Sequence, residues 1–472
     1  KTATAQILEQ KYRFHADKIN GYGLTNPFSI YSNGSITNDD QTDPAIGASH
    51  TALAELAAEE SMVLLKNQNN TLPIDRSTVK KIAVIGATAT FTLQETTCQD
   101  CASGGNGTLN CSTDFTQNVR TGDCGSSRVF SDPSKSAGPL AGITTAAGSG
   151  ISVARYASAS DAMKAGFDFA VVMAGLTAGD EGEEYTGAGD RTTGGITSAT
   201  HTVNLGLDPK VSAGQDNLIS QVAALGKPMV VVLEGGGIIN MPWFSSVPAI
   251  VMAWYPGMEG GTALGRLLFG DVNFSGKLPV TWDTTVSHWP EFADPSGKTE
   301  MDYWLGYRYF DHQGTALNPT MGSFPFGYGL SYTTFSYQNL QVPCTTVPSN
   351  GEVDVTVDVY NQGSAAGTET VFLFAQYPNT SVSNRAATSY KELKGFYRVS
   401  LTAMGTTGSA KRITIPLRVN DLKYWNTSQG AWAIEPGTIK VVVAPNANAV
   451  ATPCTNGAGV GCSLSDTFTV TQ

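Results

Sequence analysis

Four apolar runs in the first 285 residues have the composition of strands that are buried on both faces. They are KIAVIG (81–86), FAVVMAG (169–175), PMVVVLEG (228–235) and AIVMAWY (249–255). Continuous β-rich runs of this kind are typical of a parallel sheet that is covered on both sides. Residues 214–226 and 260–269 carry apolar side chains at helical spacing. This alternation predicts an α/β domain, an αβα sandwich that extends over residues 49–285.

Two further helical patterns precede the first of these strands. Residues 49–66, SHTALAELAAEESMVLLK, predict an amphipathic helix whose apolar positions are Leu53, Leu56, Ala57, Met62, Val63 and Leu64. Residues 1–18 also predict a helix. A polar connector with Gly, Asn and Pro follows as far as about residue 47, which is long for an ordinary loop. We interpret it as a linker from a preceding element.

The pattern changes at about residue 335. VDVTVDVYN (353–361), TVFLFAQY (370–377), KRITIPL (411–417) and IKVVVAP (439–445) alternate or run apolar, and Gly, Asn and Pro separate them. Short strands with such turns predict an all-β sandwich over residues 335–472. Residues 286–334 are then the connector between the two domains.

Composition narrows the classes of partner. Only 15% of the residues are charged and the formal net charge is −11, which argues against nucleic acid and against an anionic membrane surface. No apolar run approaches the length of a membrane span. The strand-turn VIGATAT (84–90) lacks the glycine spacing of dinucleotide-binding turns. The net charge does not argue against neutral ligands such as sugars.

Glycosylation sequons and cysteines point to a secreted, extracellular glycoprotein. Seven Asn-x-Ser/Thr sequons occur, at Asn33, Asn69, Asn106, Asn110, Asn273, Asn379 and Asn426. Four cysteines cluster at Cys98, Cys101, Cys111 and Cys124, and three follow at Cys344, Cys454 and Cys462. The cluster favours two disulfides over a zinc site, because no second Cys-x-x-Cys or His pair follows at zinc spacing. Since seven is odd, one thiol is expected to be free or to pair outside this chain.

The densest group of ionisable residues follows the second strand. The segment 180–191, DEGEEYTGAGDR, holds five carboxylates within twelve residues. A carboxyl at the carboxyl end of such a strand lies where open α/β sheets bind ligands, and crowding by like charges raises its pKa. The segment is therefore a candidate source of a proton donor. The alternative is a solvated acidic loop.

Several strings are more specific than these patterns. They are EESMVLLKN with LPI (59–67, 72–74), WYPGMEGGTALGRLLFGDVNFSGKLPVTW (254–282), GYRYFD (306–311) and FPFGYGLSYTTF (324–335). In this order and spacing the chain resembles glycoside hydrolase family 3, the β-glucosidase-like family, from about residue 49 to the end. The resemblance implies an αβα sandwich followed by a fibronectin-III-like β-sandwich. It also implies that residues 1–48 are the last helix of a preceding (β/α)8 barrel and the interdomain linker.

The resemblance also implies a retaining mechanism with two carboxyl groups about 5–5.5 Å apart. The family's nucleophile is a barrel Asp within Ser-Asp-Trp, and this sequence contains no Ser-Asp-Trp. The acid/base of many members lies in a Gly-Glu-Gly-Tyr string with Asp-Arg after it, and Gly182-Glu183-Glu184-Tyr185 matches it here. The match assigns the proton donor to Glu183 and leaves Glu181 and Glu184 as alternatives.

The other site residues that this match implies are substrate-binding. They are Tyr185, Glu184, Asp190 and Arg191. The mechanism needs no metal or other cofactor. Tyr and Phe residues of GYRYFD and FPFGYG are expected to line a domain seam in preference to a sugar site.

Two functional hypotheses follow. In the first, the chain is the C-terminal part of a secreted retaining β-glycosidase, most simply a β-glucosidase, and a separate (β/α)8 barrel chain supplies the nucleophile. Its substrate would be a β-linked oligosaccharide or glucoside. In the second, the chain is a barrel-less, non-catalytic carbohydrate-binding or structural glycoprotein derived from the same family. Five carboxylates on one segment favour the first hypothesis, while the sugar and linkage stay open.

Overall fold

The apolar runs of the first half form one six-stranded sheet. The computed structural model describes residues 44–89, 136–176, 192–193, 202–203, 205–207, 214–285, 288–289, 303–387, 389–455 and 458–471. The sheet order is β1-β8-β7-β4-β2-β3, and β1 pairs antiparallel with β8 while the other neighbours are parallel. The strands are β1 (Val63–Asn67), β2 (Lys81–Ile85), β3 (Ser152–Tyr156), β4 (Phe169–Gly175), β7 (Met229–Glu234) and β8 (Ala249–Trp254). All four predicted strands are confirmed.

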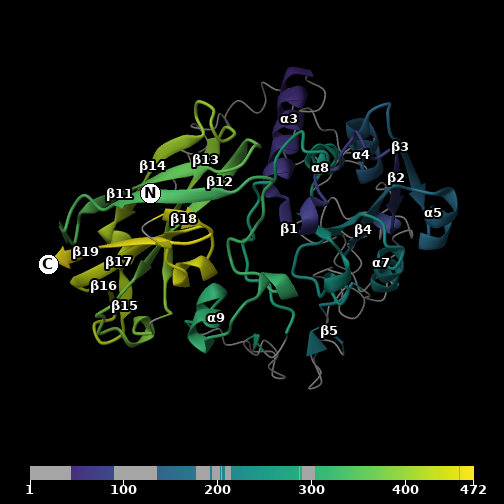
Figure 1. Cartoon of the computed structure of the whole chain (residues 1–472). Coiled ribbons are helices and arrows are strands. Elements are labelled where there is room, and N and C mark those ends of the chain that lie inside the picture. The colour runs from purple at the N-terminus through teal and green to yellow at the C-terminus, as the bar shows by residue number, and fades with distance from the viewer. Residues whose placement is uncertain are drawn as a thin grey trace, which may run out of the picture.

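Helices cover both faces of this sheet (Figure 1). One hydrophobic core lies between the sheet and helices α5 (Ala159–Ala165) and α7 (Gln215–Ala223). The other lies under α3 (Pro44–Ser61), α4 (Pro139–Ala147) and α8 (Gly260–Leu268). Because successive residues of a strand enter opposite cores, every position of a central strand must be apolar. The predicted αβα sandwich is confirmed. Among the described residues, no helix has the length and apolar character that crossing a bilayer requires.

The helix predicted for residues 49–66 is wrong at its C-terminal end. α3 stops before the apolar run, and Val63–Asn67 pair with β8 as strand β1. Residues 62–65 enter the two cores in turn, a period of two that a helix does not produce. Leu53 and Leu56, expected on the buried face, are exposed. Pairing at the sheet edge therefore decides the conformation of this run.

The apolar pattern misses several elements of the first domain. β3 is an edge strand with mixed exposure, and α4 and α5 are short helices rich in Ala, Gly, Ser and Thr. The Ser158 side chain caps α5 by accepting the backbone N–H of Asp161. Elements this short carry little periodic signal, so packing on the sheet determines them. Two very short strands, β5 (Thr192–Thr193) and β6 (Thr202–Val203), pair with each other.

The second half forms a β-sandwich. One sheet has the order β10-β19-β17-β12-β13 and the other has the order β14-β11-β9-β18. Their strands are β9 (Phe335–Gln341), β10 (Thr346–Pro348), β11 (Glu352–Asn361), β12 (Gly367–Gln376), β13 (Glu392–Leu401), β14 (Ala410–Arg418), β17 (Gly437–Ala444), β18 (Ala458–Val460) and β19 (Leu464–Thr471). The four predicted strands correspond to β11, β12, β14 and β17. Side chains from both sheets share one core, which confirms the predicted sandwich.

Aromatic side chains of the connector fill the seam between the two domains. Tyr307, in α9 (Tyr307–Gln313), packs on Phe326 and Phe374, and its hydroxyl accepts the Leu393 backbone N–H. Burial raises the pKa of Tyr307 to about 12. The hydroxyl of Tyr328 donates to the Leu65 carbonyl. These contacts are structural, as the composition of GYRYFD and FPFGYG predicts.

Helices α4 and α8 meet backbone to backbone on one face of the first sheet. A Cβ atom built on Gly142 would lie 1.7 Å from the carbonyl oxygen of Gly261. One built on Gly265 would lie 2.4 Å from the carbonyl oxygen of Gly142. Real Cβ atoms do not approach this closely, so no larger residue fits without separating the helices. The glycines therefore set the distance between α4 and α8.

We expect Gly142→Ala to destabilise the first domain by about 3 kcal/mol, because overpacking outweighs the roughly 1 kcal/mol that alanine gains in helix propensity. Gly150→Ala is the matched control, since a Cβ at Gly150 meets nothing within 4 Å. Urea unfolding followed by circular dichroism measures both. Equal midpoints for the two variants would contradict the backbone contact.

Candidate active site

Four parallel strands, β2, β4, β7 and β8, end at one edge of the sheet. Ligands of open α/β sheets bind beyond this carboxyl edge. β4 ends at Gly175, and the acidic segment 180–191 follows it in the chain. The predicted site residues lie outside the described part of the chain, so their assignment stays a prediction: Glu181, Glu183, Glu184, Tyr185, Asp190 and Arg191.

A buried amide at the start of α7 fixes the end of β4. Gln215 Oε1 accepts the Gly175 backbone N–H at 2.8 Å, and Nε2 donates to the Gly175 carbonyl at 2.9 Å. The same Nε2 donates to the Leu207 carbonyl at 2.8 Å. Buried backbone groups that leave a sheet ladder need such partners. One side chain therefore holds both ends of the stretch 176–206, which includes the acidic segment.

The next strand along the edge ends in a buried glutamate that the apolar pattern does not single out. Glu234 is the last residue of β7 and only 2% exposed. The Leu176 backbone N–H donates to its carbonyl, and a Cβ on Gly175 would lie 2.4 Å from that carbonyl oxygen. Glycine at position 175 therefore lets β4 leave the sheet directly beside Glu234.

Burial governs the charge of this carboxyl group. Desolvation raises the pKa of Glu234 from 4.5 to about 8, and the Thr88 hydroxyl opposes the rise only weakly. Neither Glu234 Oε2 nor Thr88 Oγ1 has a hydrogen-bond partner of good geometry within the described residues. At neutral pH the carboxyl is therefore protonated and neutral. A single acidic residue closing an otherwise apolar strand is the sequence signal that could have identified it.

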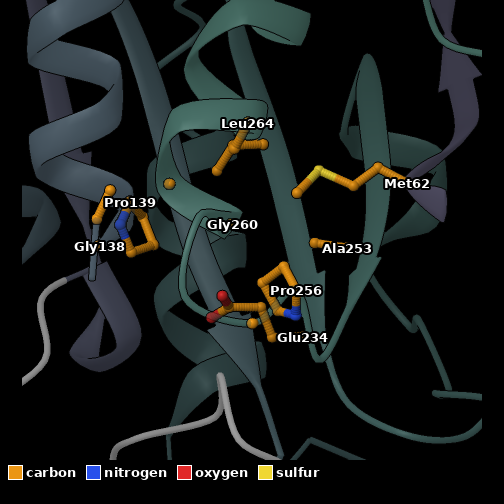
Figure 2. Close-up of a pocket in the computed structure, with 11 residues that line it drawn as sticks. Met62, Gly138, Pro139, Glu234, Ala253, Pro256, Gly260 and Leu264 are labelled. Atoms are coloured by element: carbon orange, nitrogen blue, oxygen red, sulfur yellow. The ribbon is translucent and has the colours of Figure 1, made fainter. Parts of the chain in front are cut away.

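Glu234 borders a small cavity between the N-terminal ends of α4 and α8 (Figure 2). Gly138 and Pro139 line it from α4, Pro256 and Gly260 line it from α8 and its preceding turn, and the remaining surface is apolar. Its volume is about 10 Å³, which is room for roughly one water molecule. A sugar ring does not fit, so the cavity is not the substrate site.

Backbone strain occurs at the same edge. Trp254, the last residue of β8, has a φ of +59°. The pairing of β7 with β8 shifts register there, so that Glu234 lies opposite Trp254. A bulky residue in the left-handed region costs on the order of 1–3 kcal/mol and persists only where its surroundings hold it. Trp254 Nε1 donates to the Ser61 carbonyl at 3.1 Å and supplies one such contact.

A His–Asp pair lies where the first domain ends. His288 Nδ1 lies 2.7 Å from Asp283 Oδ2, and Asp283 is buried while His288 is exposed. Asp283 Oδ1 also accepts the Thr285 backbone N–H, so it is held in place. Within the described ranges no group of three or more His, Cys, Asp or Glu side chains has the arrangement of a metal site.

The profile of the Glycosyl hydrolase family 3 C-terminal domain matches residues 62–332 of this chain. The chain belongs to glycosyl hydrolase family 3. A fibronectin type III-like domain profile matches residues 369–447, within the β-sandwich. The resemblance on which the sequence prediction rests is thereby confirmed.

Curated relatives of this family 3 chain are β-glucosidases. It is 32% identical over 413 residues to "Thermostable beta-glucosidase B" of Acetivibrio thermocellus, covering 84% of this chain and 46% of the relative. It is 31% identical over 452 residues to "Probable beta-glucosidase L" of Aspergillus fumigatus, covering 87% of this chain and 53% of the relative. The chain therefore spans about half the length of the curated relatives it matches.

Solved structures give the same fold. The Trichoderma reesei β-D-glucoside glucohydrolase superposes with a TM-score of 0.68 at 26% identity, covering 93% of this chain and 57% of that one. The shared part of this family 3 chain is thus the α/β sandwich together with the β-sandwich. The carboxyl edge described above belongs to that shared part.

We expect Glu234→Gln to stabilise the domain by an amount that grows with pH. Between pH 4.5 and about 8 the unfolded carboxyl is ionised while the folded one stays protonated, so the wild type loses stability as pH rises. The free energy of unfolding of the variant then exceeds that of the wild type by up to about 5 kcal/mol at pH 8, because each unit of pKa difference contributes roughly 1.4 kcal/mol.

Urea unfolding at pH 5, 6, 7 and 8 measures this trend. Glu234→Leu is the control, because it also lacks the titrating group and should differ from Glu234→Gln by an amount that does not change with pH. A difference between wild type and Glu234→Gln that stays constant from pH 5 to 8 would show that Glu234 is not a buried neutral acid.

Proposed function

We propose that this chain is the C-terminal part of a secreted retaining β-glucosidase that hydrolyses terminal β-D-glucosyl residues and supplies the acid/base carboxyl group. The observation that carries the proposal is the place of the acidic segment in the sequence, directly after β4 and between two anchored points of the chain. It follows β4 at the carboxyl edge of a family 3 sandwich, and Gln215 holds the chain on both sides of it. General acid catalysis requires a positioned proton donor, and anchoring the chain at Gly175 and Leu207 would serve that requirement.

Glu183 is the proposed proton donor. Its neighbours Glu181 and Glu184 disfavour its ionisation, so it would hold its proton at a higher pH than an isolated carboxyl does. Asp190 and Arg191 would anchor the segment, and Tyr185 would lie at the rim of the sugar subsite. Glu234 is not an alternative donor, because its carboxyl group is buried beside a cavity too small for a sugar.

The nucleophile must come from outside these 472 residues, since no Ser-Asp-Trp occurs among them. We propose a (β/α)8 barrel as its source. The relatives are single polypeptides about twice as long as the matched region, which favours a barrel on the same polypeptide over the separate chain that the sequence alone suggested. Sequencing of the coding region that precedes Lys1 distinguishes the two arrangements.

Secretion is supported by the cysteines and the sequons. Cys454 and Cys462 form a disulfide, while Cys344 is free and exposed, in keeping with an odd cysteine count. Disulfides persist in oxidising compartments. The four clustered cysteines and the sequons at Asn33, Asn106 and Asn110 lie outside the described residues.

The four described sequons differ in accessibility. Asn69 and Asn379 are exposed and suited to carry a glycan, and Asn426 is half-buried at the end of a short strand. Asn273 is the least suited, because Nδ2 donates to the Ala366 carbonyl and Oδ1 accepts two hydrogen bonds at the domain seam. Glycosylation at all four positions stays a prediction.

We expect Glu183→Gln, in the enzyme that includes its barrel, to slow hydrolysis of cellobiose about 100-fold or more, because a sugar leaving group needs a proton from the general acid. Hydrolysis of 2,4-dinitrophenyl β-glucoside, whose leaving group needs no proton, should fall far less. Initial rates on the two substrates give the ratio. Glu181→Gln and Glu184→Gln are the matched controls.

Equal losses of Glu183→Gln on both substrates, or no loss, would move the donor role to Glu181 or Glu184. Absence of any turnover by the barrel-containing wild type, on either substrate, would support the non-catalytic glycoprotein instead.

A further inference from the structure

Two tryptophans stand out on the surface of the β-sandwich. β15 (Tyr424–Asn426) and β16 (Ala431–Ala433) form a separate two-stranded ribbon in which Trp425 lies directly opposite Trp432. Side chains of directly opposed residues project from the same face of a ribbon. The two indole rings, here called the Trp platform, have centroids 5.6 Å apart at an interplanar angle of 77°.

Stability of the ribbon does not account for the Trp platform. An edge-to-face aromatic pair contributes roughly 0.5–1.5 kcal/mol beyond its buried area. Yet 51% of Trp425 and 63% of Trp432 stay exposed to water, so most of the apolar area of these large side chains is not used in folding. Edge-to-face packing also leaves an indole face open. The two exposed rings also lie together on one face and are not scattered singly, as exposed apolar residues without a binding role usually are.

A buried arginine holds the backbone directly before the first strand of the ribbon. Arg385 is buried, forms an ion pair with Glu392, and donates to the carbonyls of Leu422 and Lys423, directly before β15. Its guanidinium group also lies 5.6 Å from the centroid of the Tyr424 ring. Charge-assisted hydrogen bonds of this kind hold the backbone in one position.

The other strand is fixed by a carboxylate. Glu435, two residues after β16, accepts the Ser381 N–H at 2.5 Å and the hydroxyls of Ser381 and Thr380 at 2.6 and 2.5 Å. Burial raises the pKa of Glu435, but these hydrogen bonds outweigh that effect and lower it. The chain is thus hydrogen-bonded to the rest of the domain both directly before β15 and shortly after β16. A platform fixed before binding loses little conformational entropy when a ligand arrives.

The ribbon carries no charge. Its ten residues, 424–433 (YWNTSQGAWA), are aromatic, small or neutral polar in a chain whose net charge is −11. A ligand that matches it is neutral, has flat apolar faces, and carries hydroxyls for Asn, Thr, Ser and Gln. β-Linked glucose has equatorial hydroxyls and two faces of axial C–H groups, and such faces stack on indole rings.

We propose that the Trp platform binds a neutral β-linked glucan. This deepens the proposed function, on which it rests, by naming a polymeric substrate class. In Figure 1 the ribbon lies at the outer, lower-left side of the β-sandwich. Stacking on the platform would keep a glucan chain close to the enzyme between hydrolytic events.

Native affinity electrophoresis of the 472-residue chain tests the proposal. The net charge of −11 moves the protein, while soluble mixed-linkage β-glucan in the gel is neutral, so retardation reports binding directly. Trp425→Ala and Trp432→Ala should each weaken the apparent affinity about tenfold, as truncation of a central aromatic contact does. Trp432→Phe keeps a smaller stacking face and the cross-strand pair, and should weaken binding by an intermediate factor.

Phe396→Ala is the matched control, because Phe396 is an equally exposed aromatic residue of the same domain, at 61%. It should be retarded like the wild type. Unchanged retardation of folded Trp432→Ala and Trp432→Phe would overturn the proposal, as would equal retardation of the wild type by dextran, whose linkages are α.

Two other occupants of the Trp platform, the protein's own glycan and a second copy of the chain, give different results. If retardation appears only in Asn426→Gln, which removes the sequon beside Trp425, the platform is covered by the protein's own glycan and the proposal fails. If sedimentation shows a wild-type dimer that Trp432→Ala dissociates, the platform is a self-interface, and the proposal also fails. Retardation does not require turnover. If the wild-type chain is retarded by β-glucan while the barrel-containing enzyme hydrolyses no β-glucoside, the result therefore counts against the proposed function alone.

Discussion

The carboxyl edge of the first sheet depends on hydrogen bonds to the buried backbone groups at the point where β4 leaves the sheet. At Gly175 the ladder ends inside the protein, and an unpaired N–H or carbonyl there would cost on the order of 1–3 kcal/mol. Gln215 supplies both missing partners and bonds to Leu207 as well. Because that amide comes from the first turn of α7, the helix fixes the chain at Gly175 and at Leu207 together.

The same edge tolerates a glutamate that costs stability. Glu234 closes a strand whose other residues are apolar, and its Oε2 has no hydrogen-bond partner among the described residues. Its neutral form avoids most of the cost of burying a charge, although an unpaired carboxyl oxygen still carries a desolvation penalty. The strained Trp254 lies opposite it. Two unfavourable features at one edge are typical of a region selected for something besides stability.

The sequence predicts the elements whose signal is local and strong. Strands β2, β4, β7 and β8 are continuous apolar runs, and only a sheet covered on both faces gives that pattern. The run at 62–67 has an ambiguous periodicity over six residues, so the sequence predicts a helix there, and only its long-range pairing with β8 resolves the conformation. Gln215 and Trp254 could not be ranked in advance, since their roles depend on which strands become neighbours, whereas Glu234 closes an apolar run that the sequence itself shows.

The second domain packs against the rest of the chain, and this affects how the Trp platform could act. Lys391 forms a buried ion pair with Asp311 of the connector at 2.5 Å, and Arg398 pairs with Glu60 of α3 at 2.9 Å. The aromatic contacts of Tyr307 with Phe326 and Phe374 add apolar area to the same seam. A glucan bound at residues 424–433 would therefore be held by a domain that packs on the first, unlike a polymer held by a module on a flexible linker.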